Sequence, residues 1–294
     1  MLQKYMKNNI NKNYLKIYFI KRFSRIYVVL IPALIIGFCF DYFGKNLFIE
    51  LYTQSHTLQA VNFNVVENMN FENFIGNILN LQTIFFNHFG SNSPLWSLSN
   101  EWWYYMLFPL FFLGTKNRIL LFALILVLFI FNIDILIYSI IWLLGAFVFQ
   151  IKKKMVHIRI SVFLFILVLL ISRLKPGLYI DLAIACSLGF LINSIKYSEF
   201  SFNLFESLNS KMADFSYSLY LFHFPIMAFL VSVVHSFYIE MSPMQFDLTS
   251  LSIFLVVLTF SYVLSYLMYV LFERNTNKIK NYLIIKFITK ENND

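Results

Sequence analysis

The stretch Ser93–Phe112, SPLWSLSNEWWYYMLFPLFF, decides what kind of protein this chain is. It carries one carboxylate, Glu101, followed directly by four aromatic residues (Trp102, Trp103, Tyr104 and Tyr105). Aromatic surface on every face is not typical of a soluble helix, which has one apolar stripe. In a membrane helix, an ionised group at the bilayer centre costs roughly 2.5–3.5 kcal/mol. Glu101 is therefore a candidate functional group, or it lies at the membrane interface.

The composition of the whole chain supports a membrane protein. Of its 294 residues, 59% are hydrophobic and only 13% are charged, whereas a soluble domain has about 25% charged residues. The net charge of +8 does not indicate nucleic acid, because the basic residues cluster between apolar runs, as membrane topology requires. Cys39 and Cys186 both lie inside apolar runs, which argues against a disulfide or metal framework.

We predict an all-α, polytopic transmembrane helix bundle with about eight spans. The expected spans cover residues of about 26–40, 96–113, 119–131, 135–150, 160–171, 178–193, 217–238 and 248–272. Several are shorter than the roughly 20 residues that an upright span needs, so flanking aromatic and basic residues must extend them to the interface.

The segment Phe74–Phe89 is apolar but interrupted by Asn, Gln and His. The charge distribution indicates whether it crosses the membrane. If it does not cross, the basic N-terminus, the Lys152–Arg159 loop and the basic C-terminal tail share one side. Only Lys45, Arg173 and Lys175 then lie on the other side. The positive-inside rule favours this arrangement. We therefore expect a re-entrant or interfacial helix at 74–89, both termini in the cytoplasm, and a cytoplasmic basic tail at 275–294.

Arg22 and Arg25 form the first candidate site. Three residues apart, they share one face of a helix, and they lie at the cytoplasmic N-terminus of the first span, where the helix dipole adds positive potential. Two guanidinium groups in that position suit the phosphates of coenzyme A or of a nucleotide-linked donor. The alternative is purely topological, since any first span needs flanking positive charge.

The opening stretch is the second candidate. On a helix, Ser97, Glu101 and Tyr105 share a face, and Glu101 would orient or activate a hydroxyl or pair with an arginine. Its aromatic residues, including Trp96 and Tyr105, would stack on sugar rings or adenine. The alternative is an aromatic interface belt with Glu101 in water. The charge distribution places this motif towards the outer side and favours a role near the acceptor.

The third candidate is the sequence DFSYSLYLFHFP, in which Ser216, Tyr220 and His223 form one polar stripe of a helix. Pro225 has no N–H for the Leu221 carbonyl and is expected to kink the helix there. His223 is a candidate general base, and a structural hydrogen-bond partner is the alternative.

The remaining titratable residues give weaker signals. The adjacent pair Glu273 and Arg274 at the end of the last span is interpreted as structural, and His88 in the re-entrant segment is a reserve candidate. The sequence has no metal-binding motif and no nucleotide-binding glycine loop. We therefore expect no metal and no permanently bound cofactor.

Several of these motifs together resemble the acyltransferase-3 family, multi-pass bacterial membrane proteins that O-acylate cell-surface carbohydrates. PLWSLSNEWWYYMLFPLFF resembles the family's Trp-Ser-Leu-Ser-x-Glu segment, and FIKRFSRIYVVLIPALI resembles its Arg-x-x-Arg segment. DFSYSLYLFHFPIM and VLFERNTNK resemble its late Ser-Tyr-Ser-Leu-Tyr-Leu-x-His-x-Pro segment and its closing acid–base pair. The motifs occur in the family's order and cover nearly the whole chain.

The resemblance implies a plasma-membrane enzyme that moves an acyl group, acetyl above all, from acyl-CoA to a carbohydrate hydroxyl. Arg22 and Arg25 would hold the donor phosphates. Glu101 and His223 are the catalytic candidates on the chemistry of the residues themselves, and the catalytic histidine of the family is not carried over to His223. The other residues expected to line the cavity are Trp96, Ser97, Tyr105, Ser216 and Tyr220. The alternatives are a polysaccharide-unit transporter, although no internal repeat is visible, and a non-catalytic scaffold.

The chain departs from the family at its N-terminus. Family members begin with two further helices, the first of which carries the histidine thought to be catalytic, and that histidine has no counterpart here. We therefore expect a single membrane domain over residues 1–294 that lacks those two helices and has little or no activity by itself.

Overall fold

The structure is a computed structural model that describes residues 12–53, 61–110, 118–175, 177–198, 203–237 and 247–289. It divides into unit 1, Met1–Leu124 with Leu208–Asp294, and unit 2, Ile125–Ser207. The chain passes from the first unit to the second within α7 (Arg118–Phe131) and returns within α11 (Asn203–Asp214). The single membrane domain expected over the whole chain stays a prediction.

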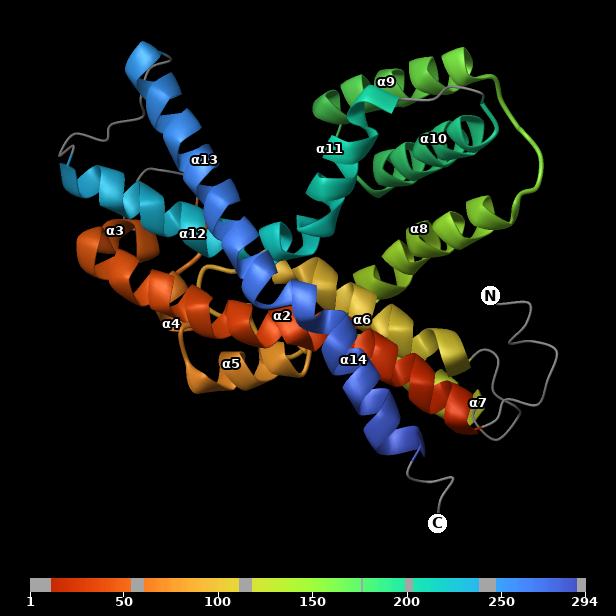
Figure 1. The fold of residues 1–294 in the computed structure, drawn as a ribbon, viewed down its shortest axis with the longest axis horizontal. Helices are drawn as coiled ribbons and strands as arrows, with labels where there is room; N and C mark the ends of the chain where they lie inside the picture. Colours follow the sequence, from red (N-terminus) through yellow and green to blue (C-terminus); the bar gives the residue numbers. More distant parts are fainter. Residues whose placement is uncertain are drawn as a thin grey trace. The chain divides into compact units, whose positions relative to one another are not determined.

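Unit 1 is built on α2, a helix of 36 residues. The helices of this unit are α2 (Lys12–Leu47), α3 (Ile49–Tyr52), α4 (Val65–Asn68), α5 (Phe71–Ile78), α6 (Leu95–Leu110), α12 (Ser216–Phe237), α13 (Leu248–Leu271) and α14 (Thr276–Ile284), with short helical turns at Glu273–Asn275 (η2) and Ile285–Thr289 (η3). One stripe of α2, with Ile26, Leu30 and Ala33, is buried, as expected for a helix that packs on one face. In Figure 1, α12 runs along α2 and α13 crosses both of them.

The all-α prediction is confirmed, since the described residues contain helices and only one isolated bridge pair of extended residues. Each of the eight predicted spans coincides with a helix of the structure. Within the described ranges, five stretches are long and apolar enough to cross a membrane: Leu15–Leu47, Ile133–Gln150, Leu178–Lys196, Ser216–Phe237 and Leu248–Ile288. The helix over Ile119–Phe131 is apolar but shorter. The total of eight spans stays a prediction.

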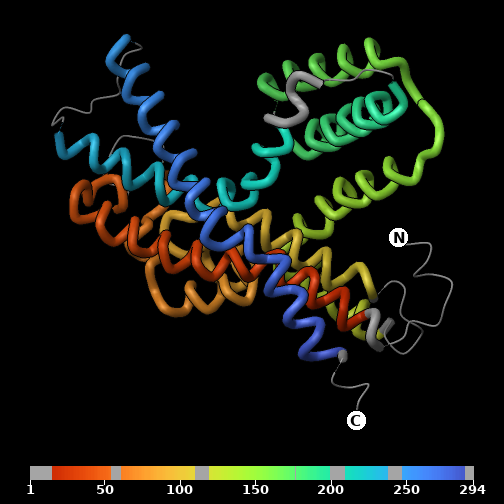
Figure 2. The backbone as a smooth tube through the Cα atoms, in the orientation of Figure 1, coloured from red at the N-terminus to blue at the C-terminus, as the bar shows by residue number. Residues whose placement is uncertain are grey.

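The segment after α3 forms a hairpin rather than a crossing helix. After α5 the chain turns at Asn80 and returns without regular structure to α6, as the orange part of the tube in Figure 2 shows. The Gly90 amide donates to the Asn68 carbonyl at 3.3 Å, so the end of the hairpin meets its beginning. The helix expected over 74–89 is therefore present only as far as Ile78, because the chain turns at Asn80 with a φ of 54°. Whether the segment is re-entrant or interfacial stays a prediction.

Unit 2 contains α8 (Ile133–Gln150), α9 (Ile158–Leu174) and α10 (Leu178–Lys196). Its helices expose many apolar side chains, while polar pairs join them inside. The Ser161 and Ser194 hydroxyls are 2.6 Å apart between α9 and α10. The Tyr138 hydroxyl of α8 donates to the Asp181 carboxylate of α10 at 2.9 Å. Such interhelical hydrogen bonds are expected between membrane helices, because apolar faces gain little free energy when they move from lipid to a helix interface.

Candidate functional site

The candidate site lies in unit 1, where α2, α6 and α12 meet. Ser97, in the first turn of α6, hydrogen-bonds through its hydroxyl to the Tyr220 hydroxyl of α12 at 2.7 Å. The same Tyr220 hydroxyl also donates to the Pro94 carbonyl. The structure therefore brings Ser97 and Tyr220 together, although they lie 123 residues apart in the sequence.

Two turns further along α6, Tyr105 joins a carboxylate to a guanidinium. Its hydroxyl donates to Oε1 of Glu101, four residues earlier on the same helix face. The Arg22 guanidinium of α2 lies over the Tyr105 ring, 4.3 Å from the centroid, in cation–π geometry. The backbone carbonyl of Tyr105 accepts from the Tyr18 hydroxyl at 3.1 Å, so α2 and α6 are fixed together at this level.

The structure brings Glu101 closer to the arginines than the charge distribution suggested. Its partner Tyr105 lies beside Arg22 of α2, and α6 runs antiparallel to α2, with Trp102 packed edge-on against Tyr27. Glu101 therefore shares one site with the first candidate constellation. The side of the membrane on which Glu101 lies stays a prediction.

Arg25 completes the positive end of the site. It is exposed, and it acts electrostatically on the hydroxyls of Tyr105 and Tyr217 and on the Glu273 carboxylate. Within the described part of the chain, neither Arg22 nor Arg25 forms an ion pair with a carboxylate. Two guanidinium groups without a bound carboxylate retain their fork geometry for an anionic ligand.

His223 lies one turn after Tyr220 and, within the described residues, hydrogen-bonds only to its own helix. Its Nδ1 atom is 2.8 Å from the Tyr220 carbonyl and 3.1 Å from the Leu219 carbonyl. Because carbonyl oxygens only accept, Nδ1 carries the proton and Nε2 holds the lone pair. The side chain is half-buried and chemically able to accept a proton.

Two residues predicted for the site do not enter it. Ser216 is the first residue of α12, is exposed, and donates to the Ala213 carbonyl at 2.8 Å. The inner polar position is Ser218, whose amide and hydroxyl both bond to the Glu273 carboxylate at 3.0 and 2.6 Å. Glu273 therefore caps α12, which agrees with its interpretation as structural. Trp96 is 49% exposed, whereas Trp103 is held by the Asn80 carbonyl at 2.9 Å.

The reserve candidate His88 belongs to the hairpin and not to this site. Asn68 lies 3.2 Å from its Nε2 atom, and its ring packs edge-on against Phe63. Burial lowers the pKa of His88 to about 4, so the imidazole is neutral at pH 7 and its Nε2 accepts from the Asn68 amide.

The carbonyl freed by Pro225 has a partner that the sequence analysis missed. The Asn92 side-chain amide donates to the Leu221 carbonyl at 2.8 Å. Asn92 lies in the loop that leads into α6, so this bond ties the start of α6 to α12 one turn before Pro225. The donor for the Leu221 carbonyl thus comes from another segment, and the expected kink at Pro225 stays a prediction.

Asp41 is the second missed residue. It is part of α2 and only 1% exposed, although it lies just beyond the first span expected at about 26–40. One of its carboxylate oxygens accepts from the Ser91 amide at 2.7 Å. The signal that could have found it is periodicity, since Asp41 continues the buried stripe of α2 at helical spacing from Gly37. Asp41 and Asn92 together hold the loop in front of α6.

We expect Asn92→Ala to lower the free energy of unfolding by about 1–3 kcal/mol, because the Leu221 carbonyl would be left buried without a donor. In a Pro225→Ala background, the restored backbone N–H donates to that carbonyl, so Asn92→Ala should then cost less than about 1 kcal/mol. Thermal unfolding of the four proteins in detergent measures this difference. Equal losses of unfolding free energy in both backgrounds would show that the Asn92 amide does not replace the N–H that Pro225 lacks. The cycle also cancels the packing of Pro225 on Gly37, where a Cβ would lie 3.3 Å from the proline ring.

No group of three or more His, Cys, Asp or Glu side chains that could hold a metal occurs within the described ranges. The site therefore offers hydroxyls, one carboxylate, one imidazole and two guanidinium groups. This set suits acid–base chemistry on an anionic substrate.

Apolar helices of spanning length, with hydroxyl, carboxylate and guanidinium groups meeting between three of them, define a multi-pass membrane protein with an internal polar site. The family model of the acyltransferase 3 group, described as an acyltransferase domain, matches residues 5–270, and the chain belongs to this family. The resemblance drawn from the four motifs is thereby confirmed. A search of curated proteins and a search of solved structures gave no significant match.

Proposed function

We propose that this membrane acyltransferase moves an acyl group, acetyl above all, from acyl-CoA to a hydroxyl of a cell-surface or extracellular polysaccharide. The observation that carries the proposal is the pair Arg22 and Arg25, free of carboxylate partners and set beside the Tyr105–Glu101 hydrogen bond. Acyl-CoA is both an acyl donor and a polyanion, so one site of this composition serves its binding and its chemistry.

The donor would bind with its phosphates on the two guanidinium groups. Each charge-assisted bond of this kind is about twice as strong as a neutral one. Arg22 is held in place by the rings of Tyr18 and Tyr105, at 5.4 and 4.3 Å from its guanidinium carbon. A cation fixed in this way loses less side-chain entropy when a phosphate binds.

The transfer itself requires that the acceptor hydroxyl lose a proton. In the proposed step, Nε2 of His223 takes this proton while the hydroxyl oxygen attacks the thioester carbonyl carbon. The carbon–sulfur bond then breaks, and the thiolate of coenzyme A leaves with the proton that His223 returns. Glu101 acts as a positioning residue that fixes the Tyr105 hydroxyl, and Ser97 and Tyr220 act as positioning residues that hold the start of α6 against α12.

In the membrane, we place both termini and the arginine end of α2 in the cytoplasm, where acyl-CoA is made. The basic segment at the chain end supports this orientation through the positive-inside rule. The polysaccharide would approach from the opposite leaflet, on the side where α2 ends at Leu47.

Calorimetric titration of the purified full chain with acetyl-CoA tests the proposal. We expect saturable binding that free coenzyme A displaces, because the phosphates supply most of the affinity. Absence of binding would contradict the proposal and favour a polysaccharide transporter or a scaffold, which have no use for coenzyme A. Transfer of radiolabelled acetyl to added polysaccharide, followed in the same preparation, reports turnover. Robust transfer would overturn the expectation that the chain alone has little activity.

A further inference from the structure

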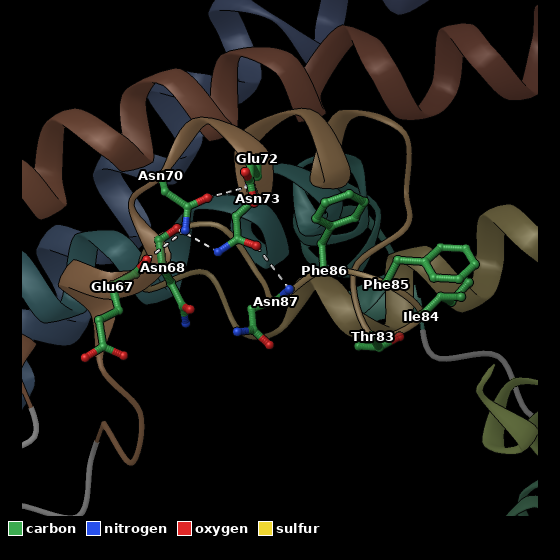
Figure 3. A pocket seen from close by; sticks show the side chains of 10 residues that line it. All are labelled: Glu67, Asn68, Asn70, Glu72, Asn73, Thr83, Ile84, Phe85, Phe86 and Asn87. Carbon is green, nitrogen blue, oxygen red and sulfur yellow. Dashed lines mark hydrogen bonds between the residues drawn. The ribbon is translucent and has the colours of Figure 1, made fainter.

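A polar hollow of about 620 Å³ lies beside the hairpin of unit 1, apart from the site described above. Its walls are α4 with the start of α5 on one side and the return loop at residues 83–87 on the other. Figure 3 shows Glu67 and Asn70 on one flank, Phe85 and Thr83 on the opposite flank, and Asn87 between them.

The two walls are fixed to each other by asparagine side chains. The Asn70 side chain caps α5 by accepting from the Asn73 amide at 2.8 Å. The Asn73 side chain in turn accepts from the Asn87 amide at 3.2 Å, and Asn77 donates to the Asn87 carbonyl at 2.9 Å. The hollow is therefore preformed, as small-molecule sites usually are.

The return loop keeps a strained conformation to present its side chains. Thr83 has a φ of 71°, a left-handed conformation that is rare for a β-branched residue. Its amide donates to the Phe86 carbonyl at 2.9 Å. Gly76 leaves room for the Phe86 ring, since a Cβ there would lie 2.5 Å from it. Strained residues of this kind concentrate at ligand sites.

Several groups in the hollow are open to a ligand. Among the described residues, the Glu72 carboxylate and the Asn87 side-chain amide have no hydrogen-bond partner within the protein. The Phe85 ring is 51% exposed beside them. Two carboxylates and no basic residue line the hollow, which disfavours phosphates and acidic polymers.

We propose that this hollow binds a neutral oligosaccharide. A side-chain amide both donates and accepts, and a carboxylate accepts through two oxygens, which suits neighbouring hydroxyls of a sugar ring. An exposed aromatic ring offers its electron-rich face to the C–H groups of the same ring. The identification of this ligand as the polysaccharide acceptor rests on the proposed function. The acceptor would then be held by the segment that follows the outer end of α2.

The test measures glycan binding to the purified full chain without any acyl donor, using an array of neutral, acidic and amino oligosaccharides. We expect neutral oligosaccharides to bind, and Asn87→Ala, Glu72→Ala and Phe85→Ala each to weaken that binding about three- to tenfold. Within the part of the chain that the structure describes, neither Asn87 nor Glu72 forms a hydrogen bond through its side chain, so truncating them should leave the fold intact. Unchanged thermal unfolding of these two variants checks this.

Glu50→Ala and Phe71→Ala are the controls, because both side chains are exposed on the same segment but do not line the hollow. They should bind as the unaltered chain does. Binding only of acidic or amino sugars, equal binding by hollow and control variants, or no binding at all would overturn the proposal. Acetyl-CoA titration and glycan binding are separate measurements. If acetyl-CoA does not bind, the glycan result still tests the hollow, and if glycans do not bind, the titration still tests the donor site.

Discussion

Replacing Arg22 and Arg25 together by alanine should weaken acetyl-CoA binding by at least about a hundredfold. Each guanidinium would lose a charge-assisted bond to phosphate, worth about 1.5–3 kcal/mol, and two such losses multiply in the dissociation constant. Neither side chain is committed to a carboxylate of the described residues, so the double replacement leaves no buried acid unpaired. Calorimetric titration gives the affinity, and thermal unfolding gives the stability of the same preparations.

Lys21→Ala is the control for this experiment. Lys21 precedes Arg22 on α2, carries the same charge, and is half-buried. Its removal should change the affinity no more than about threefold, since it reports only long-range electrostatics. Arg22→Lys together with Arg25→Lys should give an intermediate loss, because lysine keeps the charge but not the planar fork. If the lysine control and the arginine variants behave alike, the arginines serve topology and not donor binding.

The class of the fold and the composition of the site could be predicted because both depend on residues that are close together in the sequence. Hydrophobic runs and the positive-inside rule depend on neighbouring residues, and so does the helical spacing that puts Glu101 and Tyr105 on one face. The carbonyl freed by Pro225 also follows from local chemistry. These features reappear in the structure as the Tyr105–Glu101 bond and the Asn92–Leu221 bond.

What the sequence did not yield depends on how distant segments pair. Charge counting assigns a loop to a side of the membrane, but it does not give the depth of a residue within a helix. Glu101 was therefore separated from Arg22, although α6 runs back along α2 and brings Tyr105 to it. Ser216 shares the stripe of Tyr220 by spacing, but it stands at the exposed end of α12. Asp41 appeared to be a loop charge, because the apolar run ends before the helix does.

Gly90→Ala should produce the largest loss of stability, about 3–5 kcal/mol. Gly90 has a φ of 60°, and a Cβ there would lie 2.2 Å from the buried Asp41 carboxylate oxygen. Alanine would therefore meet both a left-handed backbone and a clash with the oxygen that accepts from the Ser91 amide. Thermal or denaturant unfolding measures the loss. Gly145→Ala is the contrasting change, since a Cβ there meets nothing within 4 Å in α8 and should be neutral or slightly stabilising.

The same change should also weaken acetyl-CoA binding, although Gly90 touches none of the donor-site residues. Gly90 leads directly into Ser91 and Asn92, which bond to Asp41 of α2 and to Leu221 of α12. If this loop shifts, the register of α6 against both helices shifts with it, and Glu101 and Tyr105 move away from Arg22. Asp41→Ala should relieve part of the clash, so the double variant should lose less than the sum of the single losses. Full additivity, or a stable Gly90→Ala protein with intact binding, would show that the loop does not position α6.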